Sequence, residues 1–206
     1  MPYGCRCTER HDRRRVVLTG GPGAGKTAVL DLVRHSLCVH VVILPESAGI
    51  VYGGGFPRDD RVAARRAAQR AIFHVQRELE DVGDIGGPAV VLCDRGTVDG
   101  AAYWPGPDDL WSAVGTTLAE EQLRYDTAIH LRPSAHGTGP RNNPLRIETP
   151  AEAISIDERI AELWSAHPRV FTVDATPRFL LKAAHALALL REEVPACCRP
   201  PALALD

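Results

Sequence analysis

The chain has 206 residues, of which 45% are hydrophobic and 24% are charged, and its formal net charge is −2. This composition is that of an ordinary globular protein, and the length suffices for one domain with a substantial buried core. The near-neutral charge argues against a dedicated nucleic-acid binder, which carries a net basic surface. The longest apolar runs fall far short of the ~20 residues that span a bilayer, and the N-terminus lacks the pattern of a secretory signal. We therefore expect a cytoplasmic protein without a membrane span.

Six cysteines are present, and four of them lie near the ends of the chain: Cys5, Cys7, Cys197 and Cys198. A zinc site built from these four is conceivable, but neither pair has the usual gap of two to four residues. The histidines show no metal-binding spacing. We therefore interpret the four terminal cysteines as reduced thiols, and the other two, in apolar segments, as core residues.

Short apolar runs alternate with amphipathic segments along the chain. The apolar runs predict buried strands over residues 15–19, 39–44, 89–93, 127–131 and 170–173. Helical spacing of apolar residues predicts helices over 26–37, 58–82, 108–124, 151–166 and 177–193. This alternation is typical of right-handed βαβ units, so the predicted fold class is α/β, with a parallel sheet covered by helices on both faces.

Composition also predicts how the chain is organised around this fold. Residues 1–14 are a basic arm, residues 15–194 the folded domain, and residues 195–206 a tail rich in Pro and Cys. Both ends are expected to be flexible. Residues 132–150 have the Gly, Pro, Asn and Arg content of a long mobile loop.

The strongest signal is the sequence GGPGAGKT at residues 20–27, which matches the phosphate-binding P-loop pattern G-x-x-x-x-G-K-[ST]. It follows a predicted strand and opens a predicted helix, which is the context that the motif requires. Its glycines let several backbone N–H groups face one phosphate, and the helix N-terminus adds partial positive charge. The predicted nucleotide-binding residues are Gly20, Gly21, Gly23, Ala24, Gly25, Lys26, Thr27 and Ala28.

Two side chains of this motif carry its chemistry. Lys26 is expected to contact the β- and γ-phosphates of a nucleoside triphosphate. The Thr27 hydroxyl is expected to occupy a coordination position on Mg²⁺. The predicted cofactors are therefore ATP and Mg²⁺.

Two other predicted strands end in acidic residues at the same edge of the sheet. Asp94 ends the third strand, where it would hold Mg²⁺ or act as a base. Glu46 follows the second strand, where it would act as the general base toward an acceptor hydroxyl or belong to the Mg²⁺ shell. Arg95 would orient an acceptor or neutralise the transferring charge. Which of Glu46 and Asp94 takes the proton stays open.

Six segments carry a family resemblance: GGPGAGKT, PESAG at 45–49, AIFHVQRELE at 71–80, CDRGTVDGAAYW at 93–104, NPLRIE at 143–148 and IDERI at 156–160. In this order they resemble the AAA-type P-loop family that contains the ribosylnicotinamide kinase domain of the bacterial NAD-biosynthesis regulator. The resemblance extends over residues 15 to about 190. It implies a three-layer P-loop NTPase fold, similar to nucleoside and nucleotide kinases, with a five-stranded parallel sheet in the order 2-3-1-4-5.

The resemblance also implies a lid at about residues 132–150. Arg141 and Arg146 would close over the phosphates there and stabilise the charge of the transition state, with a basic surface loop as the alternative for both. Arg159 is a weaker lid candidate.

Five residues are candidates for an acceptor pocket. Asp99, Tyr103 and Trp104 would line it, with the aromatic rings stacking on a planar group, or would simply pack a turn. Gln69 and Gln76 lie on one face of a long predicted helix, where related kinases read a base, although we favour a solvated face for both.

We therefore expect an enzyme that transfers the γ-phosphate of ATP to a small acceptor, such as a nucleoside, a nucleotide or a related metabolite. Its partners would be ATP and that small molecule, and the oligomeric state stays open, a homodimer included. The alternative is a regulatory module that binds ATP or GTP, hydrolyses it slowly and acts on a protein or lipid partner. The basic arm and the Cys-rich tail motivate this alternative.

Overall fold

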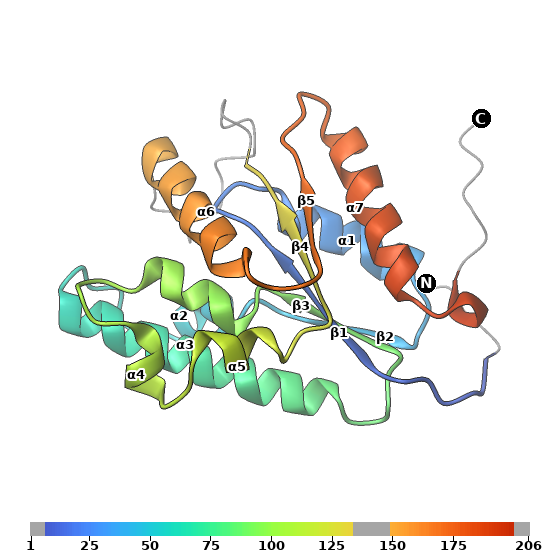
Figure 1. Ribbon diagram of the computed structural model, residues 1–206, viewed down its shortest axis with the longest axis horizontal. Helices are drawn as coiled ribbons and strands as arrows, with labels where there is room; N and C mark the ends of the chain where they lie inside the picture. Colours follow the sequence, from blue (N-terminus) through green and yellow to red (C-terminus); the bar gives the residue numbers. More distant parts are fainter. Residues whose placement is uncertain (1–6, 134–148, 200–206) are drawn as a thin grey trace.

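Five parallel strands form one sheet in the computed structural model, which describes residues 7–133 and 149–199 (Figure 1). The order across the sheet is β2-β3-β1-β4-β5, so the predicted fold class and strand order are both confirmed. The strands are β1 (Arg14–Thr19), β2 (Val41–Leu44), β3 (Val90–Asp94), β4 (Thr127–Leu131) and β5 (Val170–Val173).

Burial explains why the central strands are continuous apolar runs. All of β3 and β4, and all of β1 after its first residue, are buried. The edge strands β2 and β5 are only partly buried. A strand covered on both faces has no solvent-facing positions, so it needs no alternation of polar and apolar residues.

Helices cover the two faces of the sheet in separate layers (Figure 1). On one face, α1 (Lys26–Ser36) and α7 (Phe179–Glu193) contribute Val29, Leu30, Ala186 and Leu190 to a hydrophobic cluster. The cluster on the other face contains side chains from α6 (Pro150–Trp164) and from the 3₁₀ helix η1 (Thr97–Tyr103). The remaining helices are α2 (Ser47–Gly53), α3 (Val62–Gly83), α4 (Leu110–Val114), α5 (Leu118–Gln122) and the 3₁₀ helix η2 (Ala196–Cys198). No helix in the described part of the chain is both long and apolar enough to cross a membrane.

Four elements differ from the prediction. Neither 3₁₀ helix was predicted, and η2, whose Cys198 is buried, lies within the tail that was expected to be flexible. The helix α2 was not predicted, because its sequence contains two glycines and begins two residues after Pro45, which closes β2. The single helix predicted over 108–124 is two short helices. Gly115 ends α4 with φ +74°, and Thr117 begins α5 through a capping box with Glu120, so both boundaries have a local chemical cause.

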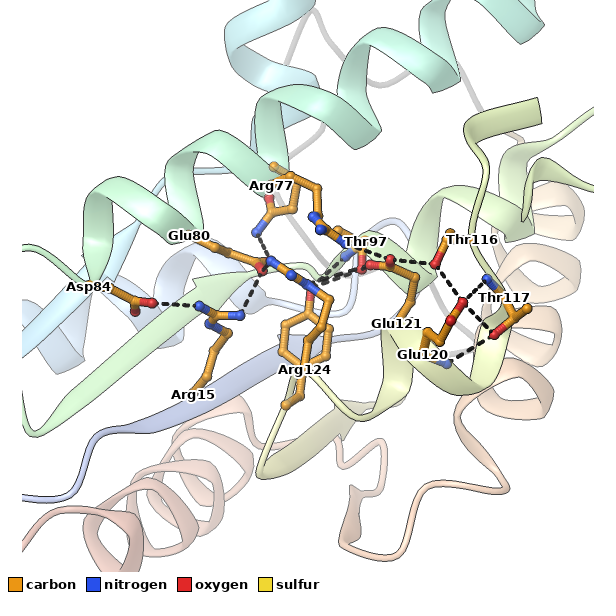
Figure 2. A network of polar contacts seen from close by, with 12 residues as sticks. Arg15, Arg77, Glu80, Asp84, Thr97, Thr116, Thr117, Glu120, Glu121 and Arg124 are labelled. Atoms are coloured by element: carbon orange, nitrogen blue, oxygen red, sulfur yellow. Dashed lines mark hydrogen bonds and ion pairs between the residues drawn. The ribbon is translucent and has the colours of Figure 1, made fainter. Parts of the chain in front are cut away.

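A buried ion-pair network connects β1, α3 and the segment after α5 (Figure 2). Its centre is Glu80 of α3, which is fully buried. Glu80 lies 3.2 Å from the Arg15 guanidinium and 2.5 Å from that of Arg124, and it accepts hydrogen bonds from the Tyr125 hydroxyl (2.6 Å) and from Gln76 (2.9 Å). Each charge that folding removes from water therefore has a partner.

The network continues to the start of η1 (Figure 2). Glu121, also fully buried, pairs with Arg77 at 2.7 Å and accepts a hydrogen bond from the Thr97 hydroxyl at 2.8 Å. The Thr97 backbone N–H donates to the Tyr125 hydroxyl at 2.7 Å. These contacts hold the segment that follows β3, where several predicted functional residues lie.

Candidate functional site

The turn from β1 into α1 has the geometry predicted for the P-loop, residues 20–27. Gly20 has φ +133°, and a Cβ added there would lie 2.1 Å from the Leu131 carbonyl oxygen. Gly25 precedes α1 with φ +90°, and its Cβ would lie 2.8 Å from the Phe179 ring. Only glycine fits either position. The first turn of α1 contains no acidic residue, so the partial positive charge of its N-terminus is available to an anion.

Lys26 folds back over this loop. Its buried ammonium donates to the carbonyl oxygens of Gly20 (2.7 Å) and Gly21 (3.1 Å). Burial, reinforced by the charge of Arg95, lowers the pKa of Lys26 to about 8, although nearby carboxylates oppose the shift. The lysine is therefore held at the P-loop by carbonyl groups that an anion could replace.

Asp157 of α6 supports the P-loop from one side. Its Oδ1 accepts the Gly21 backbone N–H at 2.7 Å and lies 2.8 Å from His130 Nε2, while Arg132 pairs with its Oδ2 at 2.8 Å. Burial opposes ionisation, but His130 and the Gly21 N–H hold the pKa of Asp157 below its ordinary value. Gly21, predicted to bind nucleotide, thus has its N–H engaged within the protein. Asp157 was not among the predicted site residues, although it belongs to the segment IDERI at 156–160.

Lys182 of α7, which was also absent from the predicted site residues, supports the P-loop from the other side. Its buried ammonium donates to the carbonyl oxygens of Ala24 (2.7 Å) and Arg132. The sequence contained one signal, because the chain has only two lysines, Lys26 and Lys182. In the structure both donate hydrogen bonds to carbonyl oxygens of the P-loop.

Asp94, at the end of β3, is buried, and its Oδ1 has no hydrogen-bond partner among the described residues. Burial raises the pKa of Asp94 to about 6, and Lys26 is the strongest of the charges that oppose this shift. A buried carboxylate oxygen without a partner is costly unless a ligand completes it. This observation and the Thr27 hydroxyl, which lines the same cavity, fit a Mg²⁺ site, since Mg²⁺ prefers oxygen ligands.

Arg95 has φ +70° and is the only residue other than glycine in the left-handed region within the described ranges. Its Nε donates to Glu46 Oε1 at 2.7 Å and its Nη1 to the Gly20 carbonyl oxygen at 3.1 Å. Its guanidinium lies 5.5 Å from the centre of the Tyr103 ring. The structure thus brings Glu46 and Arg95 together beside the P-loop, in a backbone conformation of the kind that concentrates at functional sites.

The three residues predicted to line an acceptor pocket have different surroundings. Asp99 is buried and accepts hydrogen bonds from the Thr19 hydroxyl and from Trp164 Nε1, both at 2.7 Å. Tyr103 lines the cavity described below. Trp104 does not line it; its buried ring packs beneath the Arg66 guanidinium at 5.3 Å.

A cavity of about 840 Å³ extends from the P-loop across to α2, α3, η1 and α6. This volume lies within the range of about 300–1,000 Å³ typical of small-molecule sites. Besides P-loop residues, its walls include Glu46, Arg58, Arg65, Gln69, Asp94, Arg95, Asp99, Tyr103 and Arg159. It therefore has one end at the P-loop and a second end rich in charged and polar groups.

Two sets of predicted residues remain to be placed. Gln69 lines the cavity and Gln76 binds Glu80; both are buried, so the predicted solvated face is wrong. The error arose because helical spacing does not say which polar face a neighbouring helix covers. Arg141 and Arg146 lie outside the described residues.

A family model described as an AAA domain matches residues 15–179. No match was found among curated proteins. Among solved structures, a NadR protein in complex with NR has a TM-score of 0.67 at 17% identity, over 92% of this chain and 53% of the NadR chain. A NadR protein in complex with NAD and AMP-PNP has a TM-score of 0.64 at 17% identity, over 93% and 52%. The present chain thus spans about half the length of these NadR chains.

Thymidylate kinase from Candida albicans is similar over nearly its whole length, with a TM-score of 0.62 at 13% identity, over 89% of this chain and 92% of that enzyme. At these identities the likeness shows the fold. The family model and the fold together confirm the predicted resemblance to P-loop proteins of the kinase type.

Proposed function

Since the chain belongs to the AAA domain family, we propose that it is an ATP-dependent phosphotransferase whose acceptor is a nucleoside, a nucleotide or a related small metabolite. The observation that carries this proposal is the two-ended cavity. A nucleotide hydrolase needs only the phosphate-binding end and a water molecule. The second end is lined by polar and charged side chains, namely Arg58, Arg65, Gln69, Tyr103 and Arg159. These side chains provide partners for another polar molecule. The compounds named with NadR and thymidylate kinase support the acceptor class.

The residues at the phosphate end have separate roles in this proposal. The N-terminus of α1 and the Lys26 ammonium bind the phosphates of ATP. Thr27 and Asp94 hold Mg²⁺, which neutralises phosphate charge when bound. The carbonyl groups that now hold Lys26 release it as a stronger, charged acceptor arrives.

Glu46 is the group that we assign to the acceptor hydroxyl. Its side chain is 37% exposed, lines the cavity, and is oriented by Arg95 Nε. Asp94 is more deeply buried, and Lys26 is the strongest charge acting on it. The geometry thus favours Asp94 for the metal and Glu46 for accepting the hydroxyl proton. Catalysis then comes from positioning and electrostatics, without a covalent intermediate.

The test is a screen of nucleosides, nucleotides and small hydroxylated metabolites with ATP and Mg²⁺, in which phosphorylated product is detected by mass spectrometry. We expect turnover of at least one acceptor and its loss in Lys26→Met. The matched control is Arg34→Met, which alters an exposed residue on the same helix and should retain activity. Glu46→Gln should lower kcat by at least about a hundredfold while leaving the KM for ATP unchanged.

Slow ATP hydrolysis with every compound, and no phosphorylated product, would overturn the proposal. That outcome would favour the alternative of a regulatory module with slow hydrolysis. Product formation by Lys26→Met at the wild-type rate would remove the P-loop from the mechanism.

A further inference from the structure

Three segments far apart in the sequence meet at the edge of the sheet where the strands begin. Cys7 and His11 precede β1, His40 directly precedes β2, and η2 follows α7. Figure 1 shows the chain before β1 and the segment after α7 at the same end of the molecule. The P-loop lies at the other edge, where β1 ends.

Four side chains from these segments converge, and we call them the terminal cluster: Cys7, His11, Cys197 and Cys198. Their sulfur and nitrogen atoms all lie within 4.8 Å of one another. The Sγ atoms of Cys7 and Cys197, 190 residues apart in the chain, are 3.6 Å apart, and those of Cys197 and Cys198 are 4.0 Å apart. His11 Nε2 lies 3.3, 3.6 and 3.5 Å from the sulfurs of Cys7, Cys197 and Cys198.

These distances are those of a tetrahedral zinc site. Bond lengths of about 2.3 Å for Zn–S and about 2.0–2.1 Å for Zn–N place tetrahedral ligands about 3.8 Å apart for two sulfurs and about 3.6 Å apart for sulfur and nitrogen. No disulfide joins the cysteines that the structure describes, since a disulfide would need an S–S distance of about 2.05 Å. A single imidazole nitrogen in near-equal contact with three sulfurs is explained by a common centre, since one N–H cannot be aimed at three acceptors.

We propose that Cys7, His11, Cys197 and Cys198 bind one zinc ion. Three thiolates and one imidazole are a soft donor set that selects zinc over Mg²⁺ or Ca²⁺. Four protein ligands leave no open position, so the site is structural. The gap of three residues from Cys7 to His11 is an ordinary ligand spacing. The prediction that the histidines show no metal-binding spacing overlooked it, because cysteines and histidines were each compared only among themselves.

His40 and Cys38 lie beside the terminal cluster. His40 Nδ1 lies 3.3 Å from Cys198 Sγ and 3.8 Å from Cys38 Sγ. An imidazole N–H directed at a ligating thiolate is the kind of outer contact that orients metal ligands. His40 thus supports the ion from the start of β2.

The zinc ion would join the arm before β1 to the end of α7 and so close almost the whole chain into a loop. Its position away from the P-loop separates this inference from the proposed function. Loss of zinc should lower the stability of the folded chain while nucleotide binding survives. Loss of the Lys26 side chain should abolish nucleotide binding while zinc stays bound.

The test is elemental analysis of the full chain, purified in a non-thiol reductant, with Co²⁺ as a spectroscopic probe after the zinc has been removed by a chelator. We expect one zinc per chain and, on adding Co²⁺ alone, the visible absorption of a tetrahedral thiolate site. His11→Ala and Cys197→Ser should each bind zinc more than about a hundredfold more weakly, because even an outer-shell partner is worth about 10–100-fold. If a variant fails to fold, the wild-type chain from which zinc has been removed still tests the proposal, because it should bind Co²⁺ on its own.

Two control variants define the ligand set. His185→Ala, an exposed histidine on α7, and Cys5→Ser should both retain one zinc per chain. The proposal is overturned if the wild-type chain carries no zinc and shows no tetrahedral Co²⁺ spectrum, or if it carries iron. It is also overturned if Cys5→Ser loses zinc while His11→Ala keeps it.

Discussion

Asp94 shows how a single side chain at the site lowers the stability of the folded chain. The carboxylate is buried at the end of β3, and one of its oxygens has no hydrogen-bond partner among the described residues. Burial raises its pKa to about 6 from an ordinary value of 3.8. The folded state therefore holds this proton more tightly than the unfolded state, and ionisation of Asp94 opposes folding. As the proposed Mg²⁺ ligand, Asp94 would favour ligand binding over the stability of the folded chain.

We predict that Asp94→Asn stabilises the chain above pH 6 in buffer without nucleotide or Mg²⁺. The stability contributed by protonated Asp94 is complete below about pH 4 and is lost as the pH rises through about 6. The difference between the two pKa values corresponds to about 3 kcal/mol. The gain should be at most this value, because Lys26 loses a nearby charge in the variant.

Urea unfolding at several pH values measures this effect. Asp81→Asn, at an exposed position of α3, is the control and should match the wild type at every pH. A wild type at least as stable as Asp94→Asn at pH 7 would contradict the prediction.

At the scale of elements, α3 is fixed to the sheet by charge as well as by apolar contacts. Glu80 is fully buried between Arg15 of β1 and Arg124. A buried pair of this kind is weak evidence of a net gain, but removal of one partner leaves a charge without compensation. The network also reaches Thr97 at the start of η1, so it connects stability to the position of the loop beside Asp94 (Figure 2).

We predict that Glu80→Gln lowers the free energy of unfolding by about 3–5 kcal/mol, because Arg124 and Arg15 lose a buried counter-charge. The exposed Glu78 on the same helix provides the matched control. Glu78→Gln should change stability by less than about 0.5 kcal/mol. Denaturant unfolding at pH 7 gives both values, and equal stabilities of the two variants would show that the network contributes nothing.

At the scale of the whole molecule, the site is assembled from segments that only the sheet brings together. The P-loop follows β1, Glu46 follows β2, Asp94 ends β3, and Arg159 belongs to α6. In a parallel sheet the carboxyl ends of the strands share one edge, so the cavity forms where these segments meet. A ligand in this cavity contacts several elements at once and binds only the folded chain.

We predict that MgATP raises the thermal midpoint of the wild-type chain. At a concentration of about 100 times Kd, binding adds about 2.7 kcal/mol, which for a chain of this size corresponds to about 5–10 °C. Lys26→Met should show almost no shift, whereas Arg34→Met should match the wild type. Differential scanning fluorimetry measures all three, and an equal shift in Lys26→Met would contradict a nucleotide site at the P-loop.

The sequence by itself determined the features that depend on neighbouring residues. The P-loop, the five strands and the acids at the strand ends follow local patterns, and parallel βαβ connections restrict how such strands assemble. Glu46, Asp94 and Arg95 could be placed at one edge of the sheet for this reason.

Only the tertiary structure decided which distant residues meet. Asp157 binds Gly21 from 136 residues away, Lys182 binds Ala24 from 158 residues away, and Cys197 meets Cys7 across 190 residues. The split of the helix predicted over 108–124 was local in cause, but these contacts were not. A contact between segments so far apart leaves no periodicity or spacing in the chain, because it forms only when packing of the helices on the sheet sets the distance between them.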